Sequence, residues 1–501
     1  MPNTYAIVQN AFSRVFVIEG RARVDHTPEY NSCLRMLGLS QNFGDIERVE
    51  CPDPNNYGKF VEVASIRGAS ERATTSLEGR YAMELKSTLL RLARKGCSID
   101  VQLHIGECTD PSDFDTFKKA LALENVSITT YSTEELGTLT SDDNAPVNET
   151  VEISAEEVYE ILPLTFQRQA DAYLTNEVVD VVYGDNASCG ECETESDGCQ
   201  ALFALTKAAG GSPSTSADIV FTLNAGGAWY AHDVDTLAAA EEPSALDVVG
   251  DYVVVVSQAT LSLHYALKSE FTSYTDPAFT EVATGFVAGK GPNDIFSTGR
   301  QAFIVGEGGY VYETTDPTAG VTVLDAGSAT IDDLNRVHAL TSQNAVAVGN
   351  SGAVIYTENG LNWGAATTRP VGNGVHLTAV FMRSESEWWV GTAGGAVYYT
   401  LNKGVTWTQV TFSGSGAGRV DDILFATDSV GYIAHALTTP RGRILRSYNG
   451  GKTWNVMPES GTLALNDRVN RLATCGDANI VVGGGLADDA ADGFLVFGLA
   501  S

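Results

Sequence analysis

The chain has 501 residues, too many for one ordinary hydrophobic core, so we expect two or more domains. Hydrophobic residues make up 44% and charged residues 19%, a balance typical of globular proteins. The formal net charge of −32 argues against a surface that grips nucleic acid or an anionic membrane, because both need a basic patch. The sequence shows neither a secretion signal nor an apolar run of about 18 residues, so we expect a protein made in the cytoplasm and no membrane span.

Residues 1–175 are predicted to form an α+β domain in which few helices flank a sheet. The clearest helix signal covers Tyr81–Lys95, where apolar residues recur on one face and Gly96 follows as a stop. A second helix is expected to begin at Asp110-Pro111, with a capping side chain and a proline in its first turn. The predicted strands, in chain order, cover residues 5–18, 60–66, 74–80, 99–105 and 126–131.

The layout of about residues 1–170 resembles a tail tube (major tail) protein of tailed bacteriophages. The resemblance rests on the strand Thr74–Arg80 entering a helix, and on Asp100–Gly106 followed by Cys108–Phe114. It implies a homo-oligomer that stacks in rings, with sheets of neighbouring copies pairing edge to edge. Genomic DNA would pass through its acidic lumen without specific binding. The polar segment Thr130–Glu157 would be either an arm between rings or a solvated loop.

The second part of the chain, residues 176–501, carries a repeated box of the form Ser/Thr-x-Asn-x-Gly-x-Thr/Ala-Trp or a near variant. Four of the six tryptophans end a copy, and the last three copies are 44 and 47 residues apart. A period in the forties in strand-rich sequence predicts a β-propeller with one four-stranded blade per repeat. The box residues are Thr222, Asn224, Gly226, Trp229, Thr357, Asn359, Trp363, Thr400, Asn402, Gly404, Trp407, Ser447, Asn449, Gly451 and Trp454.

Each box is expected to be the turn between the third and fourth strands of a blade. The Asn side chain can cap backbone N–H groups, and the Trp can anchor the turn. We prefer seven blades, although two degenerate boxes leave six or eight open. By sequence count the last blade is short of one strand, and Val158–Phe166 is the natural segment to close it. The predicted blades cover residues 178–240, 245–290, 293–328, 333–372, 377–415, 420–463 and 469–501.

The boxes resemble the Asp-box (BNR) repeats of sialidase-like and photosystem-assembly-factor-like propellers. Every good copy here carries Asn where that family usually has Asp, which still caps a turn. The resemblance implies the fold and says little about function. The Arg-Ile-Pro element that begins the sialidase pattern is absent, because Arg443-Ile444 is followed by Leu445. This departure disfavours sialidase activity.

Other reactive residues give no catalytic or cofactor pattern. Cys189, Cys192 and Cys199 could form a local disulfide, stay free, or, less favourably, hold a metal with nearby acids. The acidic run Asp488-Asp489 with Asp492 lacks the ligand spacing of a calcium loop. The histidines are scattered and the remaining cysteines, Cys475 among them, show no ligand spacing, so burial is expected for these cysteines. We predict no cofactor, no metal site and no enzyme activity.

The sequence therefore favours a structural virion protein. Residues 1–175 would polymerise into a phage tail tube and residues 176–501 would display a propeller on the outside. Expected partners are further copies of the chain, other tail proteins and a host surface glycan. The alternative is a soluble propeller that binds carbohydrate or protein, as an adhesin or assembly factor. A glycoside hydrolase is the third choice.

Overall fold

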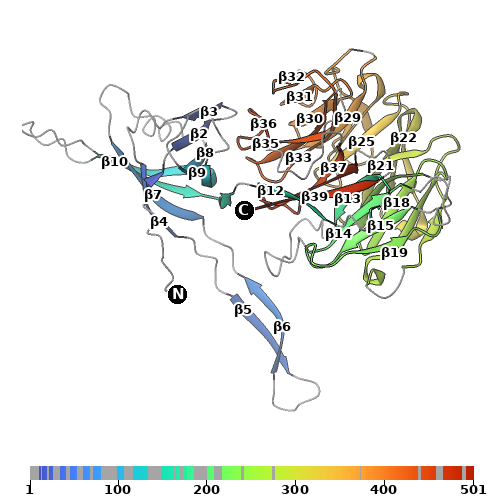
Figure 1. The fold of residues 1–501 in the computed structure, drawn as a ribbon, viewed down its shortest axis with the longest axis horizontal. Coiled ribbons are helices and arrows are strands. Elements are labelled where there is room, and N and C mark those ends of the chain that lie inside the picture. The colour runs from blue at the N-terminus through green and yellow to red at the C-terminus, as the bar shows by residue number, and fades with distance from the viewer. Residues whose placement is uncertain are drawn as a thin grey trace, which may run out of the picture. The chain divides into compact units, whose positions relative to one another are not determined.

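The computed structural model divides the chain into two compact units, Met1–Pro163 and Leu164–Ser501. The residues it describes are 11–12, 14–19, 22–25, 34–40, 46–52, 60–67, 72–80, 99–106, 117–133, 148–162, 164–169, 173–174, 176–184, 200–207, 217–237, 242–272, 277–372, 374–437, 442–457, 467–487 and 492–500. Within these ranges the regular secondary structure consists of β-strands and four short 3-10 turns (Figure 1).

The first unit is built around a nine-stranded antiparallel sheet, in the order β1-β4-β7-β10-β9-β8-β2-β3, with β11 also paired to β9. A separate two-stranded sheet joins β5 to β6. The strands are β1 (Ala11–Phe12), β2 (Arg14–Glu19), β3 (Ala22–Asp25), β4 (Leu34–Ser40), β5 (Ile46–Pro52), β6 (Phe60–Arg67), β7 (Ala73–Arg80), β8 (Ile99–Gly106), β9 (Phe117–Thr133), β10 (Asn148–Ala155) and β11 (Glu157–Ile161).

The predicted strands of this unit coincide with β1, β2 and β6–β9 over the described residues. Both predicted helices fall outside the described residues, and the ranges that the structure describes here hold strands alone, so an α+β domain is not seen. The expectation of an arm or loop over Thr130–Glu157 is wrong where it can be compared. Residues Thr130–Thr133 belong to β9, and Asn148–Ala155 form β10 beside it. Val151 and Ile153 alternate with polar neighbours and are buried, which marks a half-buried strand despite the polar composition.

The second unit consists of seven four-stranded antiparallel sheets, one for each predicted blade. The first strands of successive sheets touch in turn, from β13 through β17, β21, β25, β29, β33 and β37 and back to β13. This closed circle of sheets is a seven-bladed β-propeller. Each blade begins at its innermost strand and runs outward, and every good box lies between the third and fourth strands.

The strands of the first four blades follow one another along the chain. Blade 1 has β13 (Val178–Tyr183), β14 (Leu202–Thr206), β15 (Asp218–Thr222) and β16 (Tyr230–Asp233). Blade 2 has β17 (Pro243–Val249), β18 (Tyr252–Ser257), β19 (Ser262–Leu267) and β20 (Thr280–Val282). Blade 3 has β21 (Pro292–Ser297), β22 (Ala302–Gly306), β23 (Tyr310–Thr314) and β24 (Thr322–Ala326). Blade 4 has β25 (Leu334–Ala339), β26 (Ala345–Gly349), β27 (Val354–Thr357) and β28 (Trp363–Ala365).

The last three blades complete the ring. Short 3-10 turns also join some strands of blades 2, 3 and 4. Blade 5 has β29 (Leu377–Met382), β30 (Trp388–Thr392), β31 (Val397–Thr400) and β32 (Thr408–Val410). Blade 6 has β33 (Arg419–Phe425), β34 (Gly431–Ala436), β35 (Gly442–Ser447) and β36 (Asn455–Val456). Blade 7 has β37 (Arg468–Ala473), β38 (Val481–Leu486) and β39 (Gly493–Ala500). The 3-10 turns are η2 (Lys268–Glu270), η3 (Glu307–Gly309), η4 (Pro317–Ala319) and η5 (Asn350–Gly352).

The fourth strand of blade 7 comes from the other end of the unit. Strand β12 (Leu164–Gln169) pairs antiparallel with β39, from Leu164 opposite Ala500 to Gln169 opposite Leu495. The predicted closing segment Val158–Phe166 was therefore only partly right. Residues 157–161 form β11 in the first unit, and the sequence breaks at Pro163, which cannot donate to a strand ladder. Blade 7 thus has four strands, like the other six blades.

Side chains of both faces of each blade are buried between neighbouring blades. The adjacent residues Trp388 and Trp389 in β30 show this, because alternation sends them to opposite faces and both are fully buried. Trp388 packs in a cluster with blade 4 residues such as Val346, and Trp389 packs with blade 6 residues such as Phe425. A propeller blade therefore needs apolar residues at consecutive positions, unlike a sheet with one wet face.

The box turns are held by a short, repeated set of hydrogen bonds. In blade 5 the Thr400 hydroxyl donates to Asn402 Oδ1 at 2.9 Å and accepts from Gly404 N at 3.1 Å. Asn402 Oδ1 also accepts from Thr406 N at 2.8 Å. Blades 1 and 6 repeat the pattern through Thr222–Asn224 and Ser447–Asn449. The blade 4 box is shorter, and there Asn359 Oδ1 accepts from Asn362 N at 2.8 Å.

The box glycine in blade 6 is expected to tolerate no side chain. Gly451 has φ +85°, and a Cβ there would lie 2.3 Å from the buried Trp389 ring. We expect Gly451→Ala to lower the free energy of unfolding by about 3 kcal/mol or more, from backbone strain and overpacking. The matched control is Gly416→Ala, at φ +82° with nothing within 4 Å, where strain alone costs about 1 kcal/mol. Equal losses in urea unfolding would show that the Trp389 contact is unimportant.

Candidate functional site

The innermost strands of the seven blades place one residue each in a ring around the axis. Each of these strands has a register shift near its start, so one extra residue bulges out of the ladder. The residues that follow the bulges are Asp180, Ala245, Asp294, Arg336, Ala379, Asp422 and Arg471. We call the charged members of this set, together with Asp247, the axial belt.

The carboxylates of the axial belt satisfy the open edges of neighbouring innermost strands. Asp180 Oδ2 accepts the N–H of Leu246 in blade 2 at 3.0 Å. Asp294 Oδ2 accepts that of Val337 at 2.8 Å, and Asp422 Oδ2 accepts that of Leu472 at 2.9 Å. Asp247, two residues after Ala245 in the same strand, accepts the N–H of Ser297 in blade 3 at 2.7 Å. An inner strand edge that faces no further strand leaves its N–H groups unpaired, and these acids supply the acceptors.

Three of the bulged residues are asparagines that donate hydrogen bonds to backbone carbonyl groups of the next blade. Asn293 Nδ2 donates to Leu334 O at 2.8 Å, and Asn335 Nδ2 donates to Leu377 O at 2.9 Å. Asn470 Nδ2 donates to Val178 O at 3.0 Å, which links blade 7 to blade 1. Each bond joins one blade to the next. The bulge therefore turns a side chain toward the neighbouring blade, where an unpaired carbonyl needs a donor.

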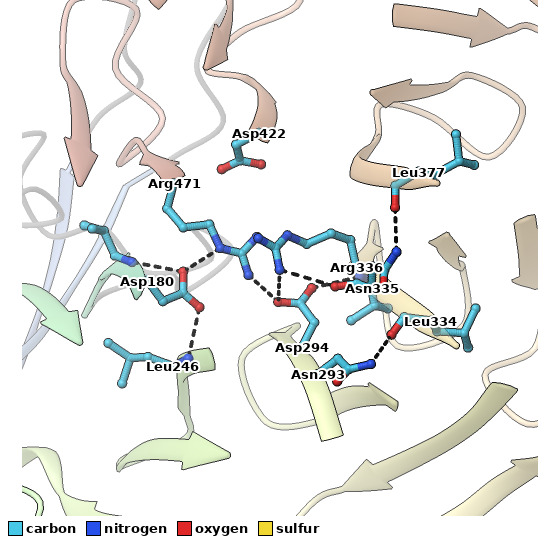
Figure 2. A network of polar contacts seen from close by, with 12 residues as sticks. Asp180, Leu246, Asn293, Asp294, Leu334, Asn335, Arg336, Leu377, Asp422 and Arg471 are labelled. Atoms are coloured by element: carbon cyan, nitrogen blue, oxygen red, sulfur yellow. Dashed lines mark hydrogen bonds and ion pairs between the residues drawn. The ribbon is translucent and has the colours of Figure 1, made fainter. Parts of the chain in front are cut away.

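Two arginines cross the axis and neutralise part of the acid charge (Figure 2). Arg471 Nε lies 3.1 Å from Asp180 Oδ1, and its Nη2 donates to Asp294 Oδ1. Arg336 Nη1 lies 3.9 Å from the same Asp294 oxygen, and Figure 2 shows the two guanidinium groups next to each other beside Asp294. Asp294 is 3% and Arg471 10% exposed at the side chain, so these contacts are shielded from water. Arg471 thus connects blade 7 to blades 1 and 3.

Burial is the largest influence on the pKa values of five belt residues, Asp180, Asp247, Arg336, Asp422 and Arg471. Burial raises the pKa of Asp247 to about 8, against the two backbone N–H donors that favour its anion. Burial also raises the pKa of Asp422 to about 6 and that of Asp180 above its usual range, while Arg471 opposes both shifts. Burial and the neighbouring Arg471 lower the pKa of Arg336. Burial would lower the pKa of Arg471 as well, but Asp180, Asp294 and Asp422 raise it, so Arg471 stays charged.

These raised pKa values predict that the ring becomes less stable as pH rises. Unfolded aspartate titrates near 3.8, whereas folded Asp247 titrates near 8. Between these values the folded chain binds more protons, so the free energy of unfolding falls with increasing pH. We expect Asp247→Asn to flatten this decrease over the whole window from about pH 4 to pH 8, and Asp422→Asn to flatten it only below about pH 6. Urea midpoints across this range measure the slopes. An unchanged slope in Asp247→Asn would contradict the assignment.

An arc of aromatic rings lies next to the belt on blades 3, 4 and 5. The His338 ring has its centroid 4.3 Å from that of Phe296 and 4.2 Å from that of Phe381. Burial lowers the pKa of His338 to about 3, so the imidazole is neutral at physiological pH. Its Nδ1 accepts the N–H of Met382 in blade 5 at 3.2 Å, as the carboxylates accept N–H groups of blades 2, 3, 4 and 7.

The residues singled out from the sequence lie elsewhere. All the box residues sit in the turns described above, on the outer part of blades 1, 4, 5 and 6, and none joins the axial belt. Cys189, Cys192, Cys199, Asp488 and Asp489 lie outside the described residues, and Asp492 is exposed. Cys475 is disulfide-bonded, so the expectation of a merely buried thiol is wrong there.

Sequence reasoning missed the axial belt, although a signal was present. Short pairs of polar residues recur at the start of the innermost strands, as Asn293-Asp294, Asn335-Arg336, Asp421-Asp422 and Asn470-Arg471. Their period matches that of the boxes. Two polar residues at the start of an otherwise apolar strand, repeated once per blade, indicate an axis that needs donors and acceptors.

The hydrogen bonds of the axial belt hold neighbouring blades together. Every carboxylate in it accepts a backbone N–H from the next blade. Among the described residues, no group of three or more His, Cys, Asp or Glu side chains could hold a metal ion. The same residues include no helix long and apolar enough to cross a membrane.

No protein-family model and no curated protein matches the chain. Among solved structures, it is similar to YCF48 bound to a D1 peptide, at 13% identity over 68% of this chain and 96% of that one, with a TM-score of 0.49. YCF48 from Cyanidioschyzon merolae gives 14% identity, 67% and 98% coverage and a TM-score of 0.49. A chain of the mitotic checkpoint complex gives 9% identity, 68% and 92% coverage and a TM-score of 0.46. Because these scores are low, the propeller assignment rests on the sheet topology.

Proposed function

We propose that this chain is a non-catalytic binding protein whose seven-bladed ring is a rigid platform for a macromolecular partner. The observation that supports this most is the internal engagement of the axial belt. Its acids bond to backbone N–H groups of neighbouring blades, and two of them also pair with Arg471. Groups used in this way hold the blades together, which leaves the exposed turns at the two ends of the ring for recognition.

Binding and turnover assays on the full chain test this proposal. We expect retention on some members of a polysaccharide and peptide array, with dissociation constants of about 1–100 μM, and no hydrolysis of model glycosides. Arg471→Met should change stability without creating or abolishing turnover. Hydrolysis that disappears in Asp294→Asn would instead make the axial acids catalytic and overturn the proposal.

We infer a second, compatible candidate from the sequence resemblance of residues 1–170, a self-associating block of a phage tail tube that carries the propeller. The observation that supports self-association is a set of strand edges with no partner among the described strands. β1 and β3 end the nine-stranded sheet, and β5 and β6 pair with each other alone among the described strands. Unpaired edges are sites where a further chain can add. In this setting other tail proteins and a host surface glycan would be partners, and the chain would reside in the virion tail.

Negative-stain microscopy of the purified full chain tests this second candidate. We expect rings or tubes with a regular repeat that grow with protein concentration. A chain that stays monomeric at every concentration in light scattering would contradict self-assembly, while leaving the binding function of the propeller open to its own assay.

A further inference from the structure

Exposed aliphatic side chains gather on the turns of two neighbouring blades. Leu340 is 43%, Leu361 59%, Leu401 51% and Val405 47% exposed. Leu340 follows the first strand of blade 4, and the other three lie between the third and fourth strands of blades 4 and 5. In an up-and-down blade these two kinds of turn lie at the same end of the sheet. We call these four residues the blade 4–5 patch.

Hydrogen bonds and an ion pair hold these turns together. Gly360 N donates to Gln343 O at 2.9 Å, which joins the two turns of blade 4. Lys403 on the blade 5 box pairs with Glu358 on the blade 4 box. Thr368, which leaves blade 4, donates from its hydroxyl to Val405 O at 3.0 Å. The patch is therefore one fixed surface rather than three independent turns.

The box turn itself does not require these aliphatic residues. At the position of Leu401, the blade 6 box has Tyr448, which is only 4% exposed. At the position of Val405, blade 6 has Lys452 and blade 1 has Gly227. Scattered exposed apolar residues are normal, but several on adjoining turns mark an interaction surface. Half-exposed Trp407, in the same turn as Leu401 and Val405, adds a large ring to this region.

The charges around the patch are mainly acidic. Glu358 is 55% exposed at the side chain, Glu385 is exposed, and Lys403, which both acids influence, is the cation between them. The chain as a whole has a net charge of −32, which disfavours acidic partner segments. A partner that covers these leucines and tolerates this field must bring apolar side chains and positive charge together.

We propose that the blade 4–5 patch docks a segment of a partner protein in which apolar side chains are flanked by lysine or arginine. The proposal rests on the binding function proposed above and specifies its site. The apolar side chains of the segment cover Leu361, Leu401 and Val405. Its basic residues lie beside Glu358 and Glu385, where they also raise the rate of association at low salt.

Two synthetic peptides and two variants of the full chain test the site. One peptide has leucines flanked by lysines, and the second has glutamates in place of the lysines. Tryptophan fluorescence or calorimetry measures binding. We expect the lysine peptide to bind the wild type and to bind Leu361→Ser/Leu401→Ser/Val405→Ser at least 10-fold more weakly. The matched control Leu223→Ser, at the position of Leu401 in the blade 1 box, should bind like the wild type.

The outcomes separate this proposal from the function on which it rests. Equal binding of the lysine peptide to the triple variant and the wild type overturns the patch but leaves a binding propeller in place. Equal or tighter binding of the glutamate peptide overturns the assigned chemistry. If the wild type binds neither peptide, the proposal fails, and the array assay still decides the general function. The substituted residues are exposed, so an unchanged melting temperature verifies that the triple variant is folded.

Discussion

Replacing Arg471 with methionine should lower the free energy of unfolding by about 3–5 kcal/mol. The change keeps an unbranched apolar stem but removes the guanidinium group, which leaves Asp180 and Asp294 as buried carboxylates without their closest cation. An unpaired buried charge costs far more than the pair contributes, because its hydration is lost without compensation. Urea unfolding followed by circular dichroism measures the difference.

Two further variants make this result specific. Arg300→Met removes an exposed arginine and should change stability by about 0.5 kcal/mol or less. The double variant Arg471→Met/Asp294→Asn also removes the carboxylate that Arg471→Met leaves unpaired. It should therefore recover part of the lost stability. If Arg471→Met lowered the free energy of unfolding by less than about 1 kcal/mol, hydration or protonation of the belt acids would already replace the contribution of the arginine.

Replacing the buried side chains of β12 with carboxylates should open the ring and lower the free energy of unfolding by more than about 4 kcal/mol. Leu164 and Phe166 are 5% and 3% exposed, and both pack over Gly498 of β39. The double change Leu164→Asp/Phe166→Asp would bury two unpaired carboxylates, so β12 should detach and leave β39 as an open edge. Thermal unfolding and limited proteolysis should show the loss, together with concentration-dependent aggregation.

The control for this change is Gln167→Asp, an exposed position on the same strand. It adds a charge without burying it and should shift the melting temperature only slightly. If the double variant kept wild-type stability, the propeller would not need ring closure by β12 in order to stay folded.

The sequence contained the architecture of the propeller because its turns are coded locally. The hydroxyl, Asn and Gly of each box lie within five residues and form their bonds without help from distant parts of the chain. These boxes mark blades 1, 4, 5 and 6, and counting the predicted strands between and after them placed blades 2, 3 and 7 close to their observed ranges. The closing strand was harder to place, since its partner lies at the far end of the ring and only Pro163 marks where one strand ends and the next begins.

The axial belt could not be assembled from the sequence for a different reason. Its members come one per blade and differ in type, as Asp294, Arg336 and Arg471 illustrate. What they share is a place after a bulge, and a bulge appears only when the strand ladders are known. The Cys475 disulfide was missed similarly, because its sequence neighbourhood has no second cysteine.

The pairing of β12 with β39 also dictates an order of events when the chain folds. β12 is synthesised before every other strand of the ring, and β39 after all of them. The inner three strands of blade 7 and the six preceding blades are hairpins between sequence neighbours, which form quickly. The last step joins segments separated by the whole ring, so its entropic barrier comes late. Until then β12 has no partner strand, and nascent chains crowded together could exchange it between rings.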